Sequence, residues 1–339
     1  MRILLFGIYD KNYSRNSVII DGLVSNGVEV YECVVDPEKN KGLKKYFSLF
    51  REYKKNKNSN FDKVFVLFPG HSVLWFARIL FGKKVVLDFF VSLYNSNIED
   101  RKKFSKTSLK AFYFWFLDWL SLVFSPVILI DTNSHKDFIS KKFFVKKKKF
   151  LVVYVGANEK IVYPMVSEKS DKFIVHFHGI GTPLHGLDKI IRAAKNLSQH
   201  KDIEFHIYGS STKEVSDNIK FFPRFEYKDI SLVLSKADLV LGIFGDTKKA
   251  NIVIPNKVYE GLASKKPVVT LETSATKELL HDLENVIFCS SVNDKSIEER
   301  ILFAKNNPAI CEKVAVSGYK TFLEKLTPKI IIKNLLEKI

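Results

Sequence analysis

Short apolar runs alternate with longer amphipathic stretches along the whole chain. The runs have the length and the β-branched and aromatic content of buried strands, whereas the stretches between them repeat apolar positions at the spacing of a helix. This alternation predicts an α/β fold in which parallel sheets are covered by helices on both faces. The expected strands span residues 2–6, 28–34, 63–68, 84–87, 127–131 and 150–153 in the first half, and 173–178, 203–208, 219–222, 239–242, 268–271 and 286–289 in the second.

The series of strands and helices begins a second time after a polar, strand-free stretch around Pro164. At 339 residues the chain is long enough for two domains of ordinary size. We therefore expect two Rossmann-like domains, residues 1–163 and 164–339, facing each other across a cleft, with a C-terminal helix that can pack back on the first domain. Ligands of open parallel sheets bind beyond the carboxyl ends of the strands, so this cleft is the expected ligand site.

One apolar stretch, residues 111–130, is long enough to raise the question of a membrane span. Asp118 lies in its middle and Pro126 interrupts it, and both features are costly in lipid. We expect instead a helix up to about residue 124 and a buried strand at 127–130. The helix either packs in the core or presents an aromatic face to a bilayer surface beside lysines, and that face would consist of Phe112, Trp115, Phe116 and Trp119.

The formal net charge of +17 is concentrated in the first half, where residues 1–165 carry +13. Such a basic field attracts nucleic acid or anionic lipid, although a solvated lysine-rich face is the commoner origin of any single run. The basic runs contain no recognised nucleic-acid-binding motif and no aromatic stacking platform. We therefore expect no nucleic acid partner and retain peripheral contact with an anionic membrane as a hypothesis.

Cysteine usage and the N-terminal segment indicate the compartment. The cysteines are odd in number and far apart, without a CxxC pair or a nearby histidine: Cys33, Cys289 and Cys311. This pattern favours a reducing compartment and no structural zinc. The segment MRILLFGIYD begins directly as a strand and lacks the features of a signal peptide. We expect a cytoplasmic protein, with the inner face of the cell membrane as its contact if it binds one.

The segment 254–269, IPNKVYEGLASKKPVV, combines a turn, a charged pair and a strand. Asn256 suits a helix N-cap, and Lys257 and Glu260, three residues apart, share a helical face. A helix N-terminus with a neighbouring lysine attracts phosphate, and a carboxylate one turn further can accept hydrogen bonds from two ribose hydroxyls. The pattern indicates a nucleotide site, and a capped surface helix with a Lys–Glu pair is the alternative.

Two loops of the second half are expected to approach the same ligand. Residues 174–197 have the pattern of a strand, a glycine-rich turn and an amphipathic helix, and His185 before the helix can donate to a phosphate oxygen. Residues 242–251 follow a strand and lead to the Asn256 helix, with Lys248 placed to bind an anionic group. His176 and His178 alternate on a strand and are expected to be packing or supporting groups. The glycines that permit close approach to a ligand are Gly179, Gly181, Gly186 and Gly245.

These segments together resemble a known family. HFHGIGTPLHGLDKIIRAAKNL and LGIFGDTKKANIVIPNKVYEGLASKKPVV look like the donor-binding half of retaining glycosyltransferases with the GT-B fold, of the family 4 or group 1 type. VVLDFFVSLYNS, LIDTNSHKDF and VVYVGANEKIVYP in the first half agree with this resemblance. It implies transfer of a sugar from a nucleoside diphosphate sugar to an acceptor hydroxyl, with retention and without a further cofactor.

The resemblance also implies roles for single residues. Glu260 matches the ribose-binding glutamate, and His185 stands where many members have a lysine that contacts the donor diphosphate. Ile180 and Ile252 replace an arginine and a glutamate that are common in the family. The expected catalytic residues are Asp88, His185 and Lys257, and the expected donor-binding residues are Gly7, Gly179, Gly181, Gly186, Gly245, Lys248, Asn256 and Glu260.

The expected function is thus sugar transfer in the synthesis of a cell-surface polysaccharide or a glycolipid, with a glycan or lipid-linked acceptor. The chain contains no Asp-x-Asp sequence, so we expect no metal ion at the diphosphate. A nucleotide-sugar epimerase of the same shape is the alternative, because it would use the same half-site. A basic nucleic-acid-binding protein is a weaker alternative.

Overall fold

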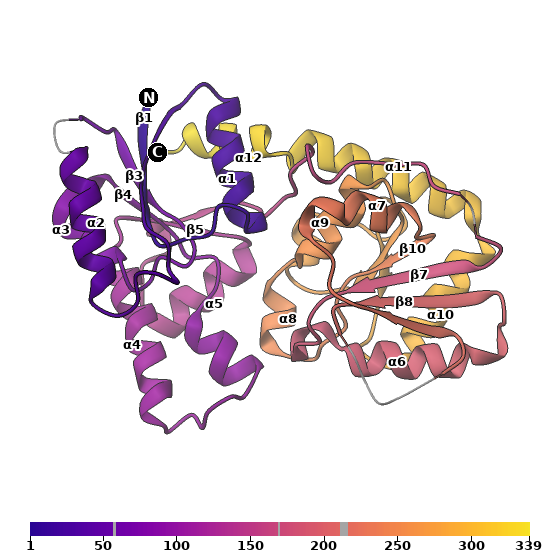
Figure 1. The fold of residues 1–339 in the computed structure, drawn as a ribbon. Helices are drawn as coiled ribbons and strands as arrows, with labels where there is room; N and C mark the ends of the chain where they lie inside the picture. The colour runs from indigo at the N-terminus through magenta and orange to yellow at the C-terminus, as the bar shows by residue number, and fades with distance from the viewer. Residues whose placement is uncertain (57–58, 169, 211–215) are drawn as a thin grey trace. The chain divides into compact units, whose positions relative to one another are not determined.

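A computed structural model describes residues 1–56, 59–168, 170–210 and 216–339, and it divides into two compact units (Figure 1). The first unit consists of Met1–Tyr154 and Pro328–Ile339, and the second of Val155–Thr327. The sequence placed the boundary between residues 163 and 164, whereas the chain passes into the second unit after Tyr154 and returns to the first at Pro328. The last residues of the chain are therefore part of the first unit.

The first unit contains a parallel sheet in the order β2-β1-β3-β4-β5-β6. Its strands match the expected positions, and the central strands are apolar runs buried on both faces, as in β4, where each residue is buried. The bounds are β1 Arg2–Gly7, β2 Glu29–Val34, β3 Lys63–Val66, β4 Val85–Asp88, β5 Val127–Ile130 and β6 Phe150–Val152. The helices of this unit are α1 Ser14–Ser25, α2 Lys44–Lys55, α3 Leu74–Phe81, α4 Leu109–Phe124, α5 Asn133–Phe143 and α12 Pro328–Leu336, and a short π-helix spans Asn95–Asp100.

Helix α12 packs directly on α1, beside which it lies in Figure 1. A Cβ at Gly22 would lie 2.3 Å from Cγ1 of Ile332, so only a glycine lets the two helices approach this closely. The Asn26 side-chain amide donates to the carbonyl oxygen of Lys329 at 2.9 Å. Local packing and a specific hydrogen bond thus join the end of the chain to its beginning.

Helix α4 has one buried and one exposed face, so neither interpretation of residues 111–124 applies to the whole helix. Trp115 and Trp119 pack against the core of the unit, whereas 65% of Phe112 and 42% of Phe116 are exposed. Asp118 on the buried face accepts hydrogen bonds from the Ser92 hydroxyl at 2.6 Å and from two backbone amides of the turn after β4. Burial raises the pKa of Asp118 to about 7, with these hydrogen bonds acting in the opposite direction. No helix in the described part of the chain is long and apolar enough to cross a membrane.

The second unit contains a parallel sheet in the order β12-β11-β10-β7-β8-β9. Its strands again occupy the expected positions: β7 Phe173–His178, β8 Ile203–Tyr208, β9 Ile219–Phe222, β10 Leu239–Leu241, β11 Val268–Leu271 and β12 Ile287–Cys289. The helices are α6 Leu187–Asn196, α7 Ile230–Ser235, α8 Lys248–Ile252, α9 Asn256–Ala263, α10 Asp294–Asn306 and α11 Pro308–Lys325. The apolar sides of α6 and α10 complete a core with the inner residues of β7, β8 and β10.

Candidate functional site

The strand order of the second sheet reverses at β7, which has β8 on one side and β10 on the other. In open parallel sheets such a switch point is where ligands bind, beyond the carboxyl ends of the strands. The two loops expected to approach a ligand follow these two neighbouring strands, since residues 179–186 come after β7 and residues 242–247 after β10. Both loops therefore lie at the same edge of the sheet.

The two loops are joined backbone to backbone. The Phe244 amide donates to the carbonyl oxygen of His185 at 3.0 Å, and the Gly245 amide donates to that of Leu184 at 3.1 Å. Gly186 has a φ of +65°, and a Cβ at this position would lie 2.5 Å from the carbonyl oxygen of Phe244. A Cβ at Gly245 would lie 2.5 Å from the carbonyl oxygen of Leu184. Glycine is thus required at both positions for the loops to meet.

Helix α9 contributes the charged residues of the site. It begins at Asn256 after an extended Pro255, so Asn256 is the first helical residue and not the N-cap that the sequence predicted. The helix ends at Ala263, shortly before β11. Lys257 and Glu260 are both only 4% exposed, which excludes the alternative of a solvated surface pair.

The Lys257 side chain reaches the glycine-rich turn. Its Nζ atom lies 4.9 Å from the centre of the Phe177 ring, and a Cβ at Gly179 would lie 3.4 Å from it. The same Cβ would lie 3.0 Å from Nδ1 of His185. Burial lowers the pKa of Lys257 to about 7, while the Glu260 carboxylate acts in the opposite direction. Two cationic or polar side chains therefore converge on a backbone segment that carries no side chain of its own, which suits an anionic ligand.

Glu260 is bound by a pair of histidines on β7. Its Oε2 atom lies 2.8 Å from Nε2 of His178, and Nδ1 of His178 lies 2.9 Å from Nε2 of His176. His176 is 1% exposed, and burial, together with the nearby His178, His206 and Lys257, holds its pKa well below the usual value. The sequence indicated only that these histidines pack or support, because their contact with Glu260 depends on how α9 lies against β7.

The remaining expected donor-binding residues of this unit lie in the loops. Gly181 is exposed and has a φ of +62°. Lys248 is the exposed first residue of α8, whose start is capped by the Thr247 hydroxyl accepting from the Ala250 amide at 3.2 Å. Lys248 is thus exposed to solvent, whereas Lys257 is buried.

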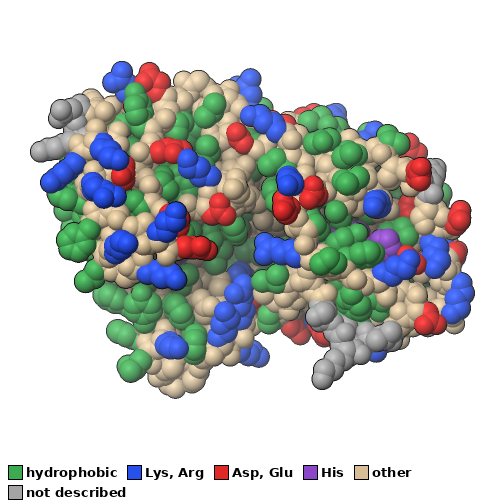
Figure 2. All heavy atoms as spheres, in the orientation of Figure 1, with side chains coloured by type: hydrophobic (Ala, Val, Ile, Leu, Met, Phe, Trp, Pro, Cys, Tyr) green, Lys and Arg blue, Asp and Glu red, His purple; other side chains and the backbone are tan. Residues whose placement is uncertain are grey.

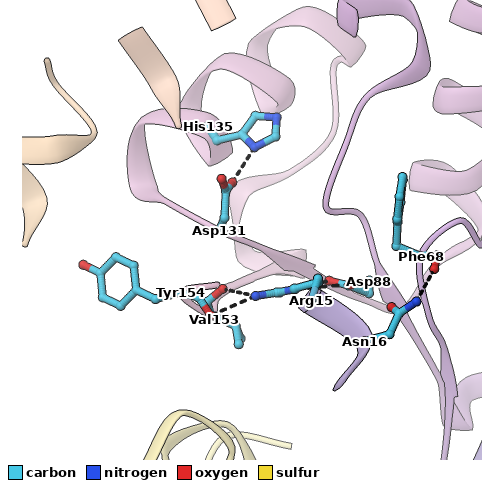
Figure 3. A network of polar contacts seen from close by, with 8 residues as sticks. All are labelled: Arg15, Asn16, Phe68, Asp88, Asp131, His135, Val153 and Tyr154. Atoms are coloured by element: carbon cyan, nitrogen blue, oxygen red, sulfur yellow. Dashed lines mark hydrogen bonds and ion pairs between the residues drawn. The ribbon is translucent and has the colours of Figure 1, made fainter. Parts of the chain in front are cut away.

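In the first unit, Asp88 at the end of β4 is held by Arg15, the second residue of α1 (Figure 3). One Arg15 terminal nitrogen donates to Oδ1 of Asp88 at 2.9 Å, and the other donates to the carbonyl oxygens of Val153 and Tyr154, each at 2.8 Å. Both side chains of the ion pair are wholly buried. The sequence did not single out Arg15, although it lies shortly after Gly7, one of the expected donor-binding residues.

Other polar groups of the first unit lie close to this ion pair. Gly7 ends β1 with a φ of +148°. The Asn16 side-chain amide donates to the carbonyl oxygens of Asp10 and Phe68, at 2.8 and 2.7 Å. Asp131, which follows β5, lies 2.5 Å from Nδ1 of His135. The Asn16 contacts join the segments that follow β1 and β3, while the Asp131–His135 pair lies within the segment that follows β5 (Figure 3).

Comparisons with known proteins agree with this architecture. Residues 164–321 match the family model of the glycosyl transferases group 1. An uncharacterised glycosyltransferase of Methanocaldococcus jannaschii is 22% identical over 219 residues, which cover 58% of this chain and only 56% of that protein. Among solved structures, sucrose-phosphate synthase of Thermosynechococcus elongatus has a TM-score of 0.75 at 10% identity, covering 99% of this chain and 98% of that one. HepE of Anabaena in complex with UDP-glucose has a TM-score of 0.73 at 14% identity, with the same coverage.

The chain therefore has the GT-B fold, as the resemblance of its motifs implied. Its second unit, which carries Glu260, Lys257 and the two joined loops, is the part that matches the group 1 family. The family match covers 158 of the 339 residues, all of them in the second unit, and the chain spans about half the length of the curated relative it matches.

Proposed function

We propose that the protein transfers a sugar from a nucleoside diphosphate sugar to an acceptor hydroxyl, with retention at the anomeric carbon. The observation that carries the proposal is the buried Lys257–Glu260 pair at the switch point, beside two glycine loops. Glu260 accepts hydrogen bonds from the ribose hydroxyls, while Lys257 and His185 face the diphosphate at Gly179. The hydrogen-bond acceptor for the ribose, Glu260, and the hydrogen-bond donor for the phosphate, Lys257, therefore lie about one turn apart on the same face of α9.

The chemical demand of such a transfer is to stabilise a departing diphosphate next to a developing oxocarbenium ion. Positioned cations and backbone amides meet this demand electrostatically, because they are fixed before the charge develops. Lys257 and His185 supply the positive charge and the hydrogen bonds to the leaving group. Gly179 and Gly186 let the backbone approach it. Asp88, which is bound to Arg15, acts in this proposal by fixing the segment after β4 and not as a free carboxylate.

The nucleotide is the first property to test. Uridine diphosphate is the preferred probe, since the similar HepE structures were solved with UDP-glucose and with UDP. A thermal-shift screen of nucleoside diphosphates and their sugars should raise the melting temperature with one base, because a ligand that binds only the folded state stabilises it. If none of them changes the melting temperature or appears in a calorimetric titration, the proposed function is wrong.

Turnover then distinguishes the transferase from the epimerase. Release of nucleoside diphosphate that depends on an added glycan or lipid-linked acceptor supports transfer, and conversion of the nucleotide sugar without an acceptor supports epimerisation. The anomeric configuration of the product, determined by NMR coupling constants, tests retention. We also propose that the reaction needs no divalent ion, so the rate should be the same in excess EDTA; loss of activity in EDTA and its return with a divalent ion would refute this part.

We further propose that the acceptor is held at an anionic membrane on the inner side of the cell, where a polysaccharide or glycolipid intermediate would be extended. The exposed face of α4 supports this, because its residues follow helical spacing along one side: Leu109, Phe112, Tyr113, Phe116, Val123 and Phe124. The exposed segment that precedes the helix and the second residue of the helix itself are basic, with Arg101, Lys102, Lys103, Lys106 and Lys110. Figure 2 shows hydrophobic side chains grouped over this part of the first unit with Lys and Arg beside them.

An apolar face beside a cluster of lysines is typical of a surface that enters the headgroup region of a bilayer. Each lysine near an anionic surface contributes about 1 kcal/mol, so the cluster is sufficient for reversible attachment. The protein should sediment with anionic vesicles at low salt and much less with neutral vesicles. The variant Phe112→Ser/Phe116→Ser should reduce sedimentation, whereas the control Leu232→Ser/Leu323→Ser, which changes two exposed apolar residues of the second unit, should not. Equal sedimentation with both vesicle types would show that the lysines are only a solvated face.

A further inference from the structure

His178 is in hydrogen-bond contact with Glu260, the proposed ribose-binding carboxylate. Glu260 is buried, and the one hydrogen bond of its side chain within the described residues is the 2.8 Å contact of Oε2 with Nε2 of His178. A buried carboxylate with a single fixed oxygen keeps acceptor capacity on the other oxygen. The position of His178 therefore determines where the other carboxylate oxygen of Glu260, which can still accept a hydrogen bond, is located.

The contacts of the histidine pair define which atom of His178 faces Glu260. A carboxylate can only accept, so Nε2 of His178 carries the proton that it donates to Glu260. The other ring nitrogen of His178, Nδ1, lies 2.9 Å from Nε2 of His176, so this second contact fixes the orientation of the His178 ring. Burial of His176, together with the nearby His178, His206 and Lys257, disfavours a charge on the His176 ring. The contacts thus run from His176 through His178 to Glu260.

We propose that His178 is a positioning residue that holds Glu260 in the orientation in which it accepts from the ribose hydroxyls of the donor nucleotide. This inference rests on the proposed function, since it requires a nucleotide at Glu260. His178 does not contact the reacting atoms in this scheme. It acts by preventing the carboxylate from rotating and by fixing the oxygen that binds the ligand, and His176 acts in turn by fixing the His178 ring.

A second His–Glu pair in the same unit provides a matched control. Nε2 of His206 lies 2.7 Å from Oε1 of Glu204, and the exposed fractions of the two side chains are 15% and 5%, the same as for His178 and Glu260. Glu204 also binds Lys172 and Lys220, so it is neutralised by the protein itself. Replacement of His206 therefore removes a similar contact without affecting a carboxylate that is reserved for a ligand.

The test compares a ribonucleotide with its 2′-deoxy form. Affinities of UDP and 2′-deoxy-UDP, or of the nucleoside diphosphate that stabilises the wild type most and its deoxy form, are measured by calorimetry for the wild type, His178→Phe, His178→Gln and His206→Phe. In His178→Phe the affinity for the ribonucleotide should fall roughly tenfold, because a hydrogen bond to a charged group is lost, and the affinity for the deoxy form, which keeps only the 3′-hydroxyl, should fall less. His178→Gln, which can still donate, should recover part of the preference for ribose.

The outcomes separate this inference from the proposed function. If His178→Phe keeps the wild-type ratio of ribose to deoxyribose affinity, the positioning role is wrong while the nucleotide site stands. If the ratio falls equally in His206→Phe, the effect is general to the sheet and the inference is also wrong. If the wild type binds none of the nucleotides, the proposed function itself fails. Should His178→Phe not fold, as judged by thermal unfolding, the comparison of His178→Gln with the wild type decides, and an unchanged ratio there refutes the inference.

Discussion

The polar clusters at the carboxyl edges of the two sheets differ in how completely the protein satisfies them. In the first unit Arg15 binds Asp88 and two carbonyl oxygens, and both charges are fully buried. In the second unit the Glu260 carboxylate has a single hydrogen bond within the described residues, and burial lowers the pKa of Lys257 to about 7. An ion pair whose polar atoms are bound within the protein holds the fold together. Buried charged groups that can still form hydrogen bonds are characteristic of a ligand site. The comparison predicts that substitutions in the two clusters affect different properties.

The largest effect should come from breaking the closed ion pair. Arg15→Met removes the partner of a buried carboxylate and should reduce the free energy of unfolding by about 3–5 kcal/mol, since Asp88 is left as an uncompensated buried charge. Urea unfolding followed by circular dichroism measures this change. Arg2→Met, which removes the partner of an exposed glutamate, is the control and should change stability little. An Arg15→Met protein of wild-type stability would show that the pair is not structural.

Neutralising the open carboxylate should affect binding and not folding. Glu260→Gln should weaken nucleotide binding by about 1.5–3 kcal/mol, because hydrogen bonds to a charged acceptor are lost while the shape of the side chain is kept. Calorimetric titration measures the affinity. Glu204→Gln, which changes an equally buried glutamate bound by lysines, should leave nucleotide affinity unchanged. Unchanged affinity in a folded Glu260→Gln would contradict the ribose assignment.

Lys257 and His185, the two side chains around Gly179, should affect the rate of turnover. Removal of one electrostatic contact to the leaving diphosphate slows an enzyme considerably, so His185→Ala and Lys257→Met should each reduce turnover by roughly tenfold or more. Steady-state rates at saturating donor separate this effect from weaker binding. Rates within a factor of two of the wild type in both variants would remove these residues from the catalytic step.

The lowered pKa of Lys257 makes nucleotide binding depend on pH. The folded protein without ligand loses this proton near pH 7, far below the ordinary value of 10.5 for a lysine. A diphosphate favours the charged amine, so binding above pH 7 should take up a proton and affinity should fall by up to about tenfold per pH unit. Titrations in two buffers of different ionisation enthalpy measure proton uptake at pH 8. In Lys257→Met the uptake should disappear.

The same linkage affects folding with a defined sign. Because the pKa of Lys257 is lower in the folded state than in the unfolded chain, the unfolded chain binds more protons between about pH 7 and 10.5. The contribution of this residue to the free energy of unfolding therefore increases with pH across that window. The free energy of unfolding of the wild type minus that of Lys257→Met should therefore be larger at pH 9 than at pH 6.

The smallest effect is expected for the exposed cation of the same unit. Lys248→Ala should weaken nucleotide binding by at most about 0.5 kcal/mol at 0.15 M salt, because a solvated charge is screened. The contrast with Lys257 tests whether burial, and not charge alone, makes a lysine important here. An effect of Lys248→Ala as large as that of Lys257→Met would indicate that the loop after β10 closes over the ligand.

The strands and the two glycine-containing loops could be predicted from the sequence because their signals are local. Apolar runs and the glycines near residues 179–186 reflect the needs of a buried strand and of a close backbone approach. The contacts of Arg15 and His178 could not be predicted, since each depends on how a helix lies on strands that are distant in sequence. The sequence could not predict which aromatic residues of α4 are buried and which are exposed, because aromatic residues occur both in a core and at a surface. Asn256 was misplaced by one residue because proline and asparagine both suit a helix start.

The return of the chain to the first unit at Pro328 determines how the two units can be made separately. Residues 155–327 are contiguous and form a natural expression fragment for the donor half, whereas residues 1–154 alone would leave the side of α1 at Gly22 uncovered. A complete first unit would need residues 328–339 supplied as a synthetic peptide or fused through a linker to residue 154. Both crossing points contact α1, through Arg15 at Val153 and Tyr154 and through Asn26 at Lys329. A split or circularly permuted version of the protein should therefore keep α1 intact, together with the two segments that contact it.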